Sequence, residues 1–187
     1  MAEEAKNLRR SVADDERRGL VLVGLMGAGK STVGKRLAQR LSLPFHDADE
    51  EIETAAGLSI AEIFERFGEP YFRDGERRVI LRLIEEEHGV IATGGGAFID
   101  TETRAAILEN ATAIWLDADI ETLVERVARR EHRPLLAGKD PETVLRDLAA
   151  ARNPDYAKAQ IHVRSGPGPH GDVVDDIVAA LKNQASA

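Results

Sequence analysis

Nine residues near the start of the chain, GLMGAGKST from Gly24 to Thr32, have the residue types and spacing of a phosphate-binding loop. They fit the pattern G-x-x-x-x-G-K-[ST] without a mismatch and directly follow the apolar run LVLV. Glycines let consecutive backbone N–H groups turn toward phosphate oxygens, and the following helix adds the partial positive charge of its N-terminus. Lys30 would bring a full charge to the β- and γ-phosphates, and Ser31 would offer a hydroxyl to Mg²⁺. The loop predicts nucleoside triphosphate binding through Gly27, Ala28, Gly29, Lys30, Ser31 and Thr32.

Two aspartates, Asp47 and Asp49, end the strand that we predict over residues 43–49. A spacing of two in an extended segment projects both side chains to the same side. One carboxylate could hold Mg²⁺, directly or through water, and the other could accept a hydrogen bond from the hydroxyl of an acceptor. The alternative is a turn followed by an acidic helix start that favours the helix dipole. The nearby phosphate loop tilts the choice toward phosphoryl transfer.

A second glycine run, Gly94 to Gly96, ends the apolar segment GVIAT. Three consecutive glycines cost conformational entropy, so their presence favours a site that needs close approach to the backbone. Such a bare backbone wall could donate N–H groups to a polar substrate. The alternative is a flexible loop.

Three arginines stand in distinctive local settings. Arg73 lies near a helix start with Glu76 three residues later, Arg133 lies in a loop, and Arg152 ends a predicted helix. Each one alone is most often part of a surface salt bridge of little energetic value. A substrate that bears a carboxylate, however, needs a planar group such as guanidinium for bidentate binding.

Short aliphatic runs alternate with amphipathic stretches of helical length along the chain. We predict strands at residues 20–24, 43–49, 89–93, 111–118 and 159–164. We predict helices at residues 30–42, 59–68, 71–87, 101–110, 119–130, 141–152 and 171–183. Ser59 and Glu62 have the spacing of a capping box, and Asp140 with Pro141 suits a helix start. This alternation indicates an α/β fold, whose mostly parallel sheet binds ligands at the carboxyl ends of its strands.

The composition limits the classes of function. The chain has 187 residues and a formal charge of −8, which disfavours extensive nucleic-acid binding. It has no cysteine, and no apolar run approaches the roughly 20 residues that a membrane span needs. We expect residues 1–18 to be a charged extension without targeting features, and residues 19–187 to form one domain of a cytoplasmic protein.

The motifs together are more specific than any one of them. The segments GLMGAGKST, DADEEIE, SIAEIFERFGEPYFRDGE, VIATGGGAF, RPLL and RNPDY occur in this order between Leu20 and Arg164, and the combination resembles the shikimate kinase family. The resemblance implies an ATP-dependent kinase that phosphorylates the 3-hydroxyl of shikimate on the route to chorismate and aromatic amino acids. It also implies a P-loop fold like that of nucleoside monophosphate kinases, with a five-stranded parallel sheet in the order 2-3-1-4-5 and a lid at about residues 129–140.

The same resemblance assigns residues to the shikimate site. Asp49 would hold the shikimate hydroxyls and act as the base, while Arg73 and Arg152 would bind the carboxylate. Glu76 would orient Arg73, and Gly94 to Gly96 would line the ring. Apolar contacts around the ring are implied for Phe64, Phe72, Pro134 and Leu135.

A second set of residues is assigned to ATP and its metal. Asp47 would support Mg²⁺ together with Ser31, and Arg133 would reach the transferring phosphate from the lid, as Lys30 does from the loop. Arg130 would stack near adenine, beside the turn SGPGP. We expect a monomer with shikimate and ATP as its small-molecule partners and with neither nucleic acid nor a membrane.

Two alternatives remain at this stage. The first is another small-molecule kinase of the same fold, such as a gluconate kinase. The second is a nucleotide-dependent regulatory module without transfer chemistry. The joint presence of Asp49, Arg73, Arg133 and Arg152 argues against the second.

Overall fold

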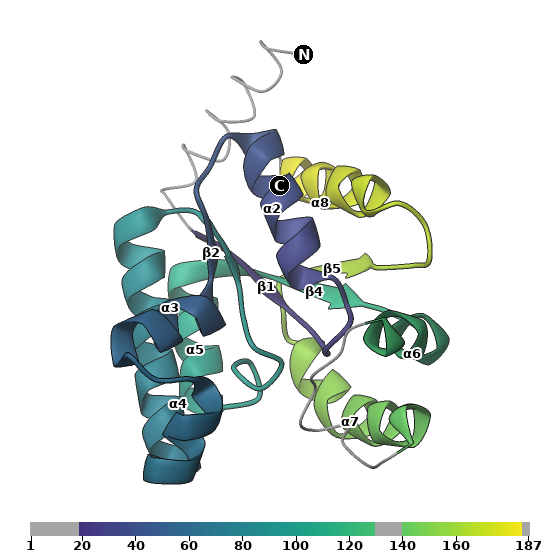
Figure 1. Ribbon diagram of the computed structural model, residues 1–187. Helices are drawn as coiled ribbons and strands as arrows, with labels where there is room; N and C mark the ends of the chain where they lie inside the picture. Colours follow the sequence, from purple (N-terminus) through teal and green to yellow (C-terminus); the bar gives the residue numbers. More distant parts are fainter. Residues whose placement is uncertain (1–18, 130–139, 185–187) are drawn as a thin grey trace.

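The computed structural model describes residues 19–129 and 140–184 (Figure 1). Its strands are β1 (Gly19–Val23), β2 (Phe45–Asp47), β3 (Val90–Ala92), β4 (Ala111–Asp117) and β5 (Ile161–Arg164). Its helices are α2 (Lys30–Leu41), α3 (Ala48–Ala56), α4 (Ile60–Glu87), α5 (Thr101–Asn110), α6 (Ile120–Ala128), α7 (Pro141–Tyr156) and α8 (His170–Gln184). No helix in these ranges combines the length and the apolar character that a membrane crossing requires.

The five strands form one parallel sheet in the order β2-β3-β1-β4-β5, as predicted. Ala92 pairs with Leu22 of β1 on one side and with Asp47 of β2 on the other, so the carboxyl ends of these three strands are level. The phosphate loop, the aspartate pair and the glycine run therefore leave the sheet at the same edge.

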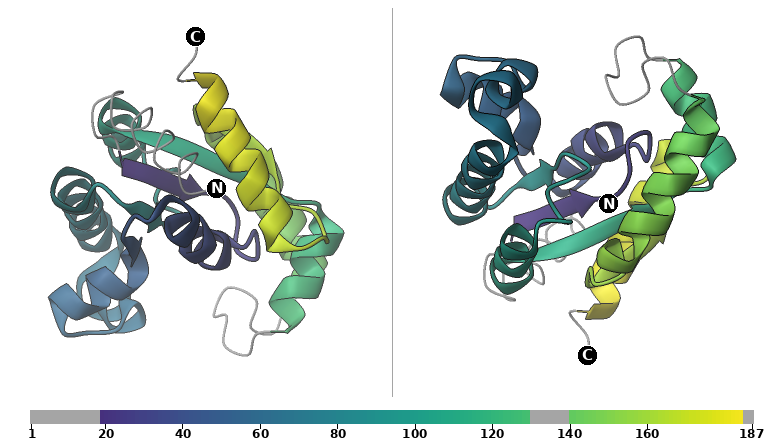
Figure 2. Two further views of the ribbon diagram at one scale, coloured as in Figure 1. Left: turned by 90° about the horizontal axis from the view of Figure 1, so that it is seen from above. Right: turned by 90° about the horizontal axis from the view of Figure 1, so that it is seen from below.

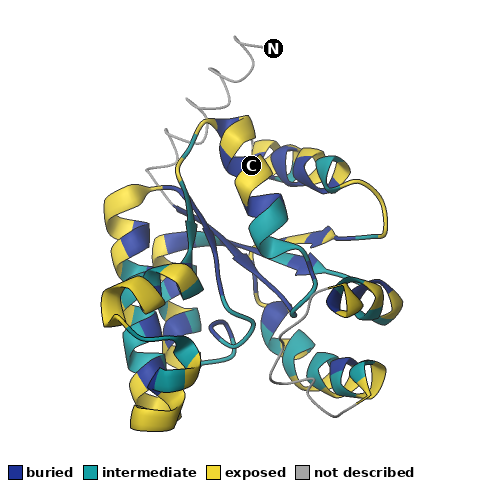
Figure 3. Cartoon of the chain, in the orientation of Figure 1, coloured by how far each residue is buried: buried dark blue, intermediate teal, exposed yellow. Residues whose placement is uncertain are grey.

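Helices cover both faces of the sheet (Figures 1 and 2). Helices α2 and α8 pack together on one face, and α4 and α5 pack together on the other. All five residues of β1 are buried, because a central parallel strand is covered on both faces. Figure 3 shows the buried strands between helices whose outer sides are exposed.

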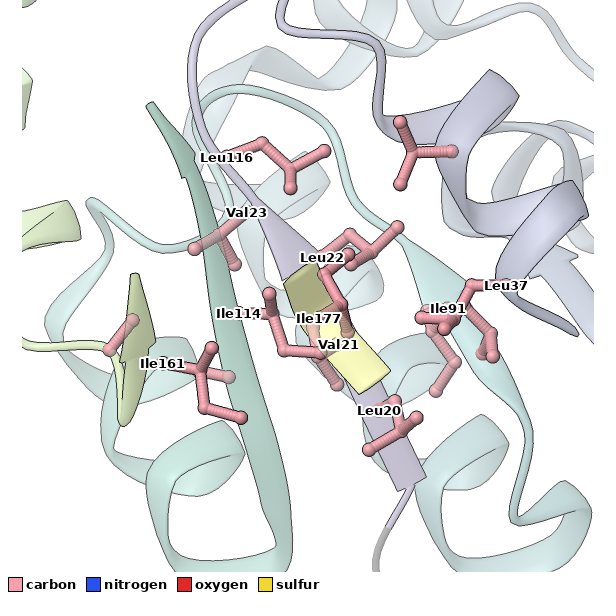
Figure 4. Close-up of a cluster of buried hydrophobic side chains, with 14 of the residues drawn as sticks. Leu20, Val21, Leu22, Val23, Leu37, Ile91, Ile114, Leu116, Ile161 and Ile177 are labelled. Atoms are coloured by element: carbon pink, nitrogen blue, oxygen red, sulfur yellow. The ribbon is translucent and has the colours of Figure 1, made fainter. Parts of the chain in front are cut away.

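The core joins side chains from the strands to those of the covering helices. Figure 4 shows Leu20 to Val23 of β1 beside Ile91, Ile114 and Ile161 of the other strands, with Leu37 of α2 and Ile177 of α8 packed over them. These side chains are no more than 4 % exposed, so the strand ends that bear the site are held by a close-packed interior.

The prediction that the second strand extends to Asp49 is wrong. β2 ends at Asp47, whose side chain accepts a hydrogen bond from the backbone N–H of Asp49 at 3.2 Å and caps α3. The chain therefore turns into a helix at Ala48. Asp47 and Asp49 still lie together, but as a helix cap and a first-turn residue.

Two other boundaries follow from local chemistry and packing. The predicted capping box is present, with Ser59 N–H donating to Glu62 at 2.9 Å. Helix α4 is interrupted at Gly68 (φ 80°, ψ 174°), between the two predicted helices.

The prediction that the helix after Pro141 ends near Arg152 is wrong, because α7 continues to Tyr156 in spite of Pro154. Tyr156 is fully buried, and this packing outweighs the effect of the proline.

Candidate active site

The phosphate loop adopts backbone conformations that only glycine accepts readily. Gly24, Gly27 and Gly29 have φ of 137°, 83° and 95°. A Cβ on Gly24 would lie 2.7 Å from the carbonyl oxygen of Leu116. Gly29 is the N-cap of α2 and provides no side-chain hydrogen bond, so the first N–H groups of the helix face the loop without a side-chain cap. This is the arrangement that binds phosphate at a helix N-terminus.

The loop side chains are already close to possible metal ligands. Ser31 Oγ donates a hydrogen bond to Asp47 Oδ2 at 2.7 Å, and Lys30 Nζ donates to the carbonyls of Gly24 at 2.7 Å and Leu25 at 3.0 Å. A hydroxyl and a carboxylate are hard oxygen donors, which suit Mg²⁺. Within the described residues, no three acidic or histidine side chains form a metal site by themselves. The pair therefore fits an ion whose remaining ligands are phosphate and water.

Asp49 lies in the same pocket, beside Asp47. Burial raises the pKa of Asp49 above its usual value, and the negative charge of Asp47 raises it further, whereas Lys30 and Arg73 oppose the change. Its carboxylate lies against the glycine run, since a Cβ on Gly94 would be 2.8 Å from Asp49 Oδ1. A carboxylate with a raised pKa is better suited to accept a proton.

Each glycine of the second run faces a predicted site residue. Gly94 faces Asp49, a Cβ on Gly95 would lie 3.4 Å from a guanidinium nitrogen of Arg152, and a Cβ on Gly96 would lie 2.5 Å from one of Arg73. The three side chains come from three different helices, α3, α7 and α4. A Cβ on Gly94 or Gly96 would come too close to these side chains, whereas one on Gly95 would be in ordinary contact, so close approach explains the glycines at positions 94 and 96.

Arg73 and Glu76 form a buried ion pair. Arg73 Nη1 donates to Glu76 Oε2 at 2.7 Å, and a second partner, Glu69, lies 3.2 Å from Nη2. Glu76 is only 1 % exposed, and burial raises its pKa to about 7 although Arg73 opposes this change. The guanidinium also lies over the ring of Phe72, 5.1 Å from its centroid. These contacts hold Arg73 against the glycine run.

Two pockets adjoin at the glycine run. The first, of about 570 Å³, is lined by the phosphate loop together with Asp47, Asp49, Gly94 and Gly95. The second, of about 640 Å³, is lined by Arg73, Arg152, Gly96 and neighbouring residues. Lys30, Ser31 and the two aspartates line the first pocket, and the two arginines line the second.

Several predicted contacts lie elsewhere. Phe72 is buried with Ile52 and Ile63 in a second apolar cluster, its ring centroid lies 4.6 Å from that of Phe64, and neither ring lines the two pockets. Four predicted residues fall outside the described ranges: Arg130, Arg133, Pro134 and Leu135. The predicted extension over residues 1–18 and nearly all of the predicted lid lie outside these ranges too.

Three basic residues that line the first pocket, Arg126, Arg129 and His170, were not predicted from the sequence. Arg126 Nη1 donates to Ser165 Oγ at 3.0 Å and also contacts the carbonyls of Gly27 and Ala28. Burial lowers the pKa of Arg126 and that of His170. No local spacing marks Arg126, because its partners lie up to 99 positions away.

A phosphate-loop strand at the centre of a 2-3-1-4-5 parallel sheet, with a carboxylate and two arginines across the same edge, defines a small P-loop kinase of the nucleoside-monophosphate-kinase-like class. Comparison with known proteins identifies the member of this class. The family model described as shikimate kinase matches residues 26–182, and the chain therefore belongs to the shikimate kinase family.

Individual relatives agree with this assignment. A shikimate kinase of Caulobacter vibrioides is 60 % identical over 163 residues, which cover 87 % of this chain and 82 % of the relative. That of Zymomonas mobilis is 57 % identical over 164 residues, which cover 88 % and 93 %. A solved structure, shikimate kinase from Acinetobacter baumannii in complex with shikimate, superposes with a TM-score of 0.84 at 36 % identity and covers 93 % of this chain and 98 % of its own. The chain is thus an ATP-dependent phosphotransferase, and the gluconate-type and regulatory alternatives are not supported.

Proposed function

We propose that this site transfers the γ-phosphoryl group of ATP to the 3-hydroxyl of shikimate. The hydroxyl oxygen forms a bond to the γ-phosphorus, the bond from that phosphorus to the β–γ bridging oxygen breaks, and ADP leaves. The hydroxyl proton passes to Asp49 and then to water. The observation that carries the proposal is the glycine run, which meets a carboxylate at Gly94 and guanidinium groups at Gly95 and Gly96.

The carboxylate of shikimate would be bound by the two arginines. Arg73 and Arg152 line the same pocket, and each has a guanidinium group against the glycine run. A pair of guanidinium groups binds a carboxylate through short charge-assisted hydrogen bonds. The Acinetobacter baumannii relative was solved with shikimate, which supports an acid ligand of this kind.

Asp49 would orient the reacting hydroxyl. Its carboxylate lies against Gly94 in the pocket that also contains Lys30 and Ser31. Phosphoryl transfer passes through a loose transition state, so positioning and neutralisation of charge contribute more than a strong base does. The raised pKa of Asp49 suits it to take the proton as the bond forms.

The phosphate loop would bind the ATP phosphates through its N–H groups and through Lys30, which would exchange its two carbonyl contacts for phosphate oxygens. Ser31 and Asp47 would hold Mg²⁺, which would neutralise the charge on the phosphates. Arg126 and His170 would line the nucleoside end of this pocket. Contacts from Arg130 and Arg133, a monomeric state, one catalytic domain over residues 19–187 and a cytoplasmic location remain sequence-based proposals.

The test is release of ADP measured with and without shikimate, with gluconate as the competing substrate. We expect ADP release that depends on shikimate and a product phosphorylated at the 3-hydroxyl, identified by phosphorus and proton NMR. Release that is equal with gluconate, or equal without any acceptor, would refute the proposed function.

The pocket lined by Arg73 and Arg152 has its own test. Arg152→Ala should raise KM for shikimate by about 10- to 100-fold, the effect of losing a charged hydrogen-bond donor, and should change KM for ATP little. The matched control is Arg146→Ala on the same helix, because Arg146 is 56 % exposed and contacts Glu142. An Arg152→Ala variant with a normal KM for shikimate would contradict the carboxylate contact.

A further inference from the structure

The hydroxyl of Tyr156 lies at the glycine run, although the proposed chemistry gives it no role. It donates a hydrogen bond to the carbonyl of Gly95, the carbonyl to which Arg152 Nη1 also donates, at 3.1 Å. Tyr156 and Arg152 are one turn apart on α7, so both side chains lie on one face of the helix. The Tyr156 ring is fully buried, with its centroid 6.1 Å from that of Trp115.

The hydrogen bonds to the Gly95 carbonyl also fix the orientation of the neighbouring N–H group. The Gly95 carbonyl and the Gly96 N–H belong to one planar trans peptide, in which the two groups point in opposite directions. Two donors on the carbonyl therefore set the direction of the Gly96 N–H. Glycine has no side chain to restrict its backbone, so contacts from outside the run help to impose this orientation.

A second contact ties the far end of the same loop to α7. Arg104, at the start of α5, donates to the carbonyls of Phe98 and Ile99, both at 3.0 Å, and lies 3.3 Å from Asp155. Asp155 directly precedes Tyr156. The last turn of α7 therefore contacts one end of the segment from Gly95 to Ile99 directly and the other end through Arg104.

We propose that Tyr156 is a positioning residue that orients the Gly95–Gly96 peptide toward shikimate, an inference that rests on the proposed function. In the ligand-free protein Arg152 shares this task. Once Arg152 turns to the carboxylate of shikimate, Tyr156 becomes the donor that keeps the Gly95 carbonyl paired. Arg152 and Tyr156, on one face of α7, thus have different roles. Arg152 binds the ligand, and Tyr156 orients the glycine run against which the ligand binds.

The test is Tyr156→Phe, which removes one oxygen and keeps the packed ring. We expect KM for shikimate, and Kd measured by calorimetry, to rise about 3- to 10-fold, the range for one lost hydrogen bond. KM for ATP should be unchanged. The melting temperature of the ligand-free variant should fall by less than about 2 °C, because Arg152 still pairs the carbonyl.

The control is Tyr71→Phe, since Tyr71 is the other tyrosine of the chain and is 54 % exposed. An unchanged affinity for shikimate in Tyr156→Phe would overturn the proposal. So would a joint loss of shikimate affinity, ATP affinity and melting temperature, which would indicate a purely structural residue. A rise of equal size in Tyr71→Phe would also overturn it.

The proposed function and this inference fail in different ways. If the unaltered protein neither binds nor phosphorylates shikimate, both are wrong. If the unaltered protein does so and Tyr156→Phe behaves normally, only the positioning role is wrong. If Arg152→Ala binds shikimate normally while Tyr156→Phe does not, Tyr156 still orients the peptide but Arg152 does not bind the carboxylate.

Discussion

Two opposing effects act on the carboxylate of Glu76. Burial disfavours its charge, and the guanidinium of Arg73, 2.7 Å away, favours it. Burial is the larger effect, and the pKa rises to about 7. Glu76, the partner of Arg73, is therefore only partly ionised near neutral pH.

This leads to a prediction on stability. Because Glu76 has a pKa of about 7 in the folded protein and 4.5 as its ordinary value, the folded state holds more protons than the unfolded state between these pH values. The contribution of Glu76 to the free energy of unfolding is thus complete below about pH 4.5 and decreases as pH rises to about 7. Relative to Glu76→Gln, the unaltered protein should lose at most about 3.5 kcal/mol across this window.

Urea denaturation of both proteins between pH 4.5 and pH 8 checks this prediction. The control is Glu69→Gln, since Glu69 also pairs with Arg73 but is 64 % exposed. A difference between the unaltered protein and Glu76→Gln that does not vary with pH would show that burial does not govern this carboxylate.

At the scale of elements, α4 joins two segments with different tasks. Its first turn is fixed by the capping box of Ser59 and Glu62, and its longer part carries Arg73 and Glu76. Gly68 separates them with φ 80° and ψ 174°, a conformation that essentially only glycine adopts. Pro70 follows in the first turn of the second segment, where its missing N–H does little harm.

Two glycines of α4 should therefore respond in opposite ways to alanine. Gly68→Ala should lower the free energy of unfolding by about 1–3 kcal/mol, because of its backbone conformation. Gly75→Ala, the matched control, should raise it by about 0.5–1 kcal/mol, because Gly75 is helical and a Cβ there meets nothing within 4 Å. Urea denaturation measures both values. Equal effects of the two substitutions would contradict this account of the break.

At the scale of the whole molecule, parallel strands bring residues from distant parts of the chain to one edge of the sheet. Lys30, Asp49, Gly95 and Arg152 come from four different βα or helical segments and meet around the two adjoining pockets. The two pockets meet at the glycine run, and shikimate would extend from Arg73 and Arg152 in one pocket to Asp49 in the other. Because none of these three residues belongs to the phosphate loop, shikimate and ATP should bind separately.

Removal of Mg²⁺ tests this separation. A chelator in excess should abolish ADP release, because the proposed mechanism needs Mg²⁺, which Ser31 and Asp47 would hold. Shikimate binding, measured by calorimetry, should remain within about twofold, since Arg73 and Arg152 need no metal. A parallel loss of shikimate affinity in the chelator would show that the two ligands do not bind separately.

The local sequence determined the features whose physical cause is local. The order of the strands and of the helices other than α3, the phosphate loop, the capping box at Ser59 and the cap at Asp140 follow from periodicity and from hydrogen bonds within a few residues. The resemblance supplied the sheet order, which the structure confirms. The second strand was predicted too long, because the residues around Asp47 are compatible both with an extended strand and with the N-cap of a helix.

Only the tertiary structure decided which groups from distant parts of the chain form hydrogen bonds or ion pairs with one another. Tyr156 lies in the segment RNPDY, which contributes to the family resemblance. The partner of its hydroxyl is Gly95, 61 positions earlier, which only the fold brings beside α7. The contacts of Arg126 with the phosphate loop and the burial of Glu76 likewise depend on how helices pack on the sheet. The reason is physical: periodicity reports the face on which a side chain lies, whereas its partner is set by topology and close packing.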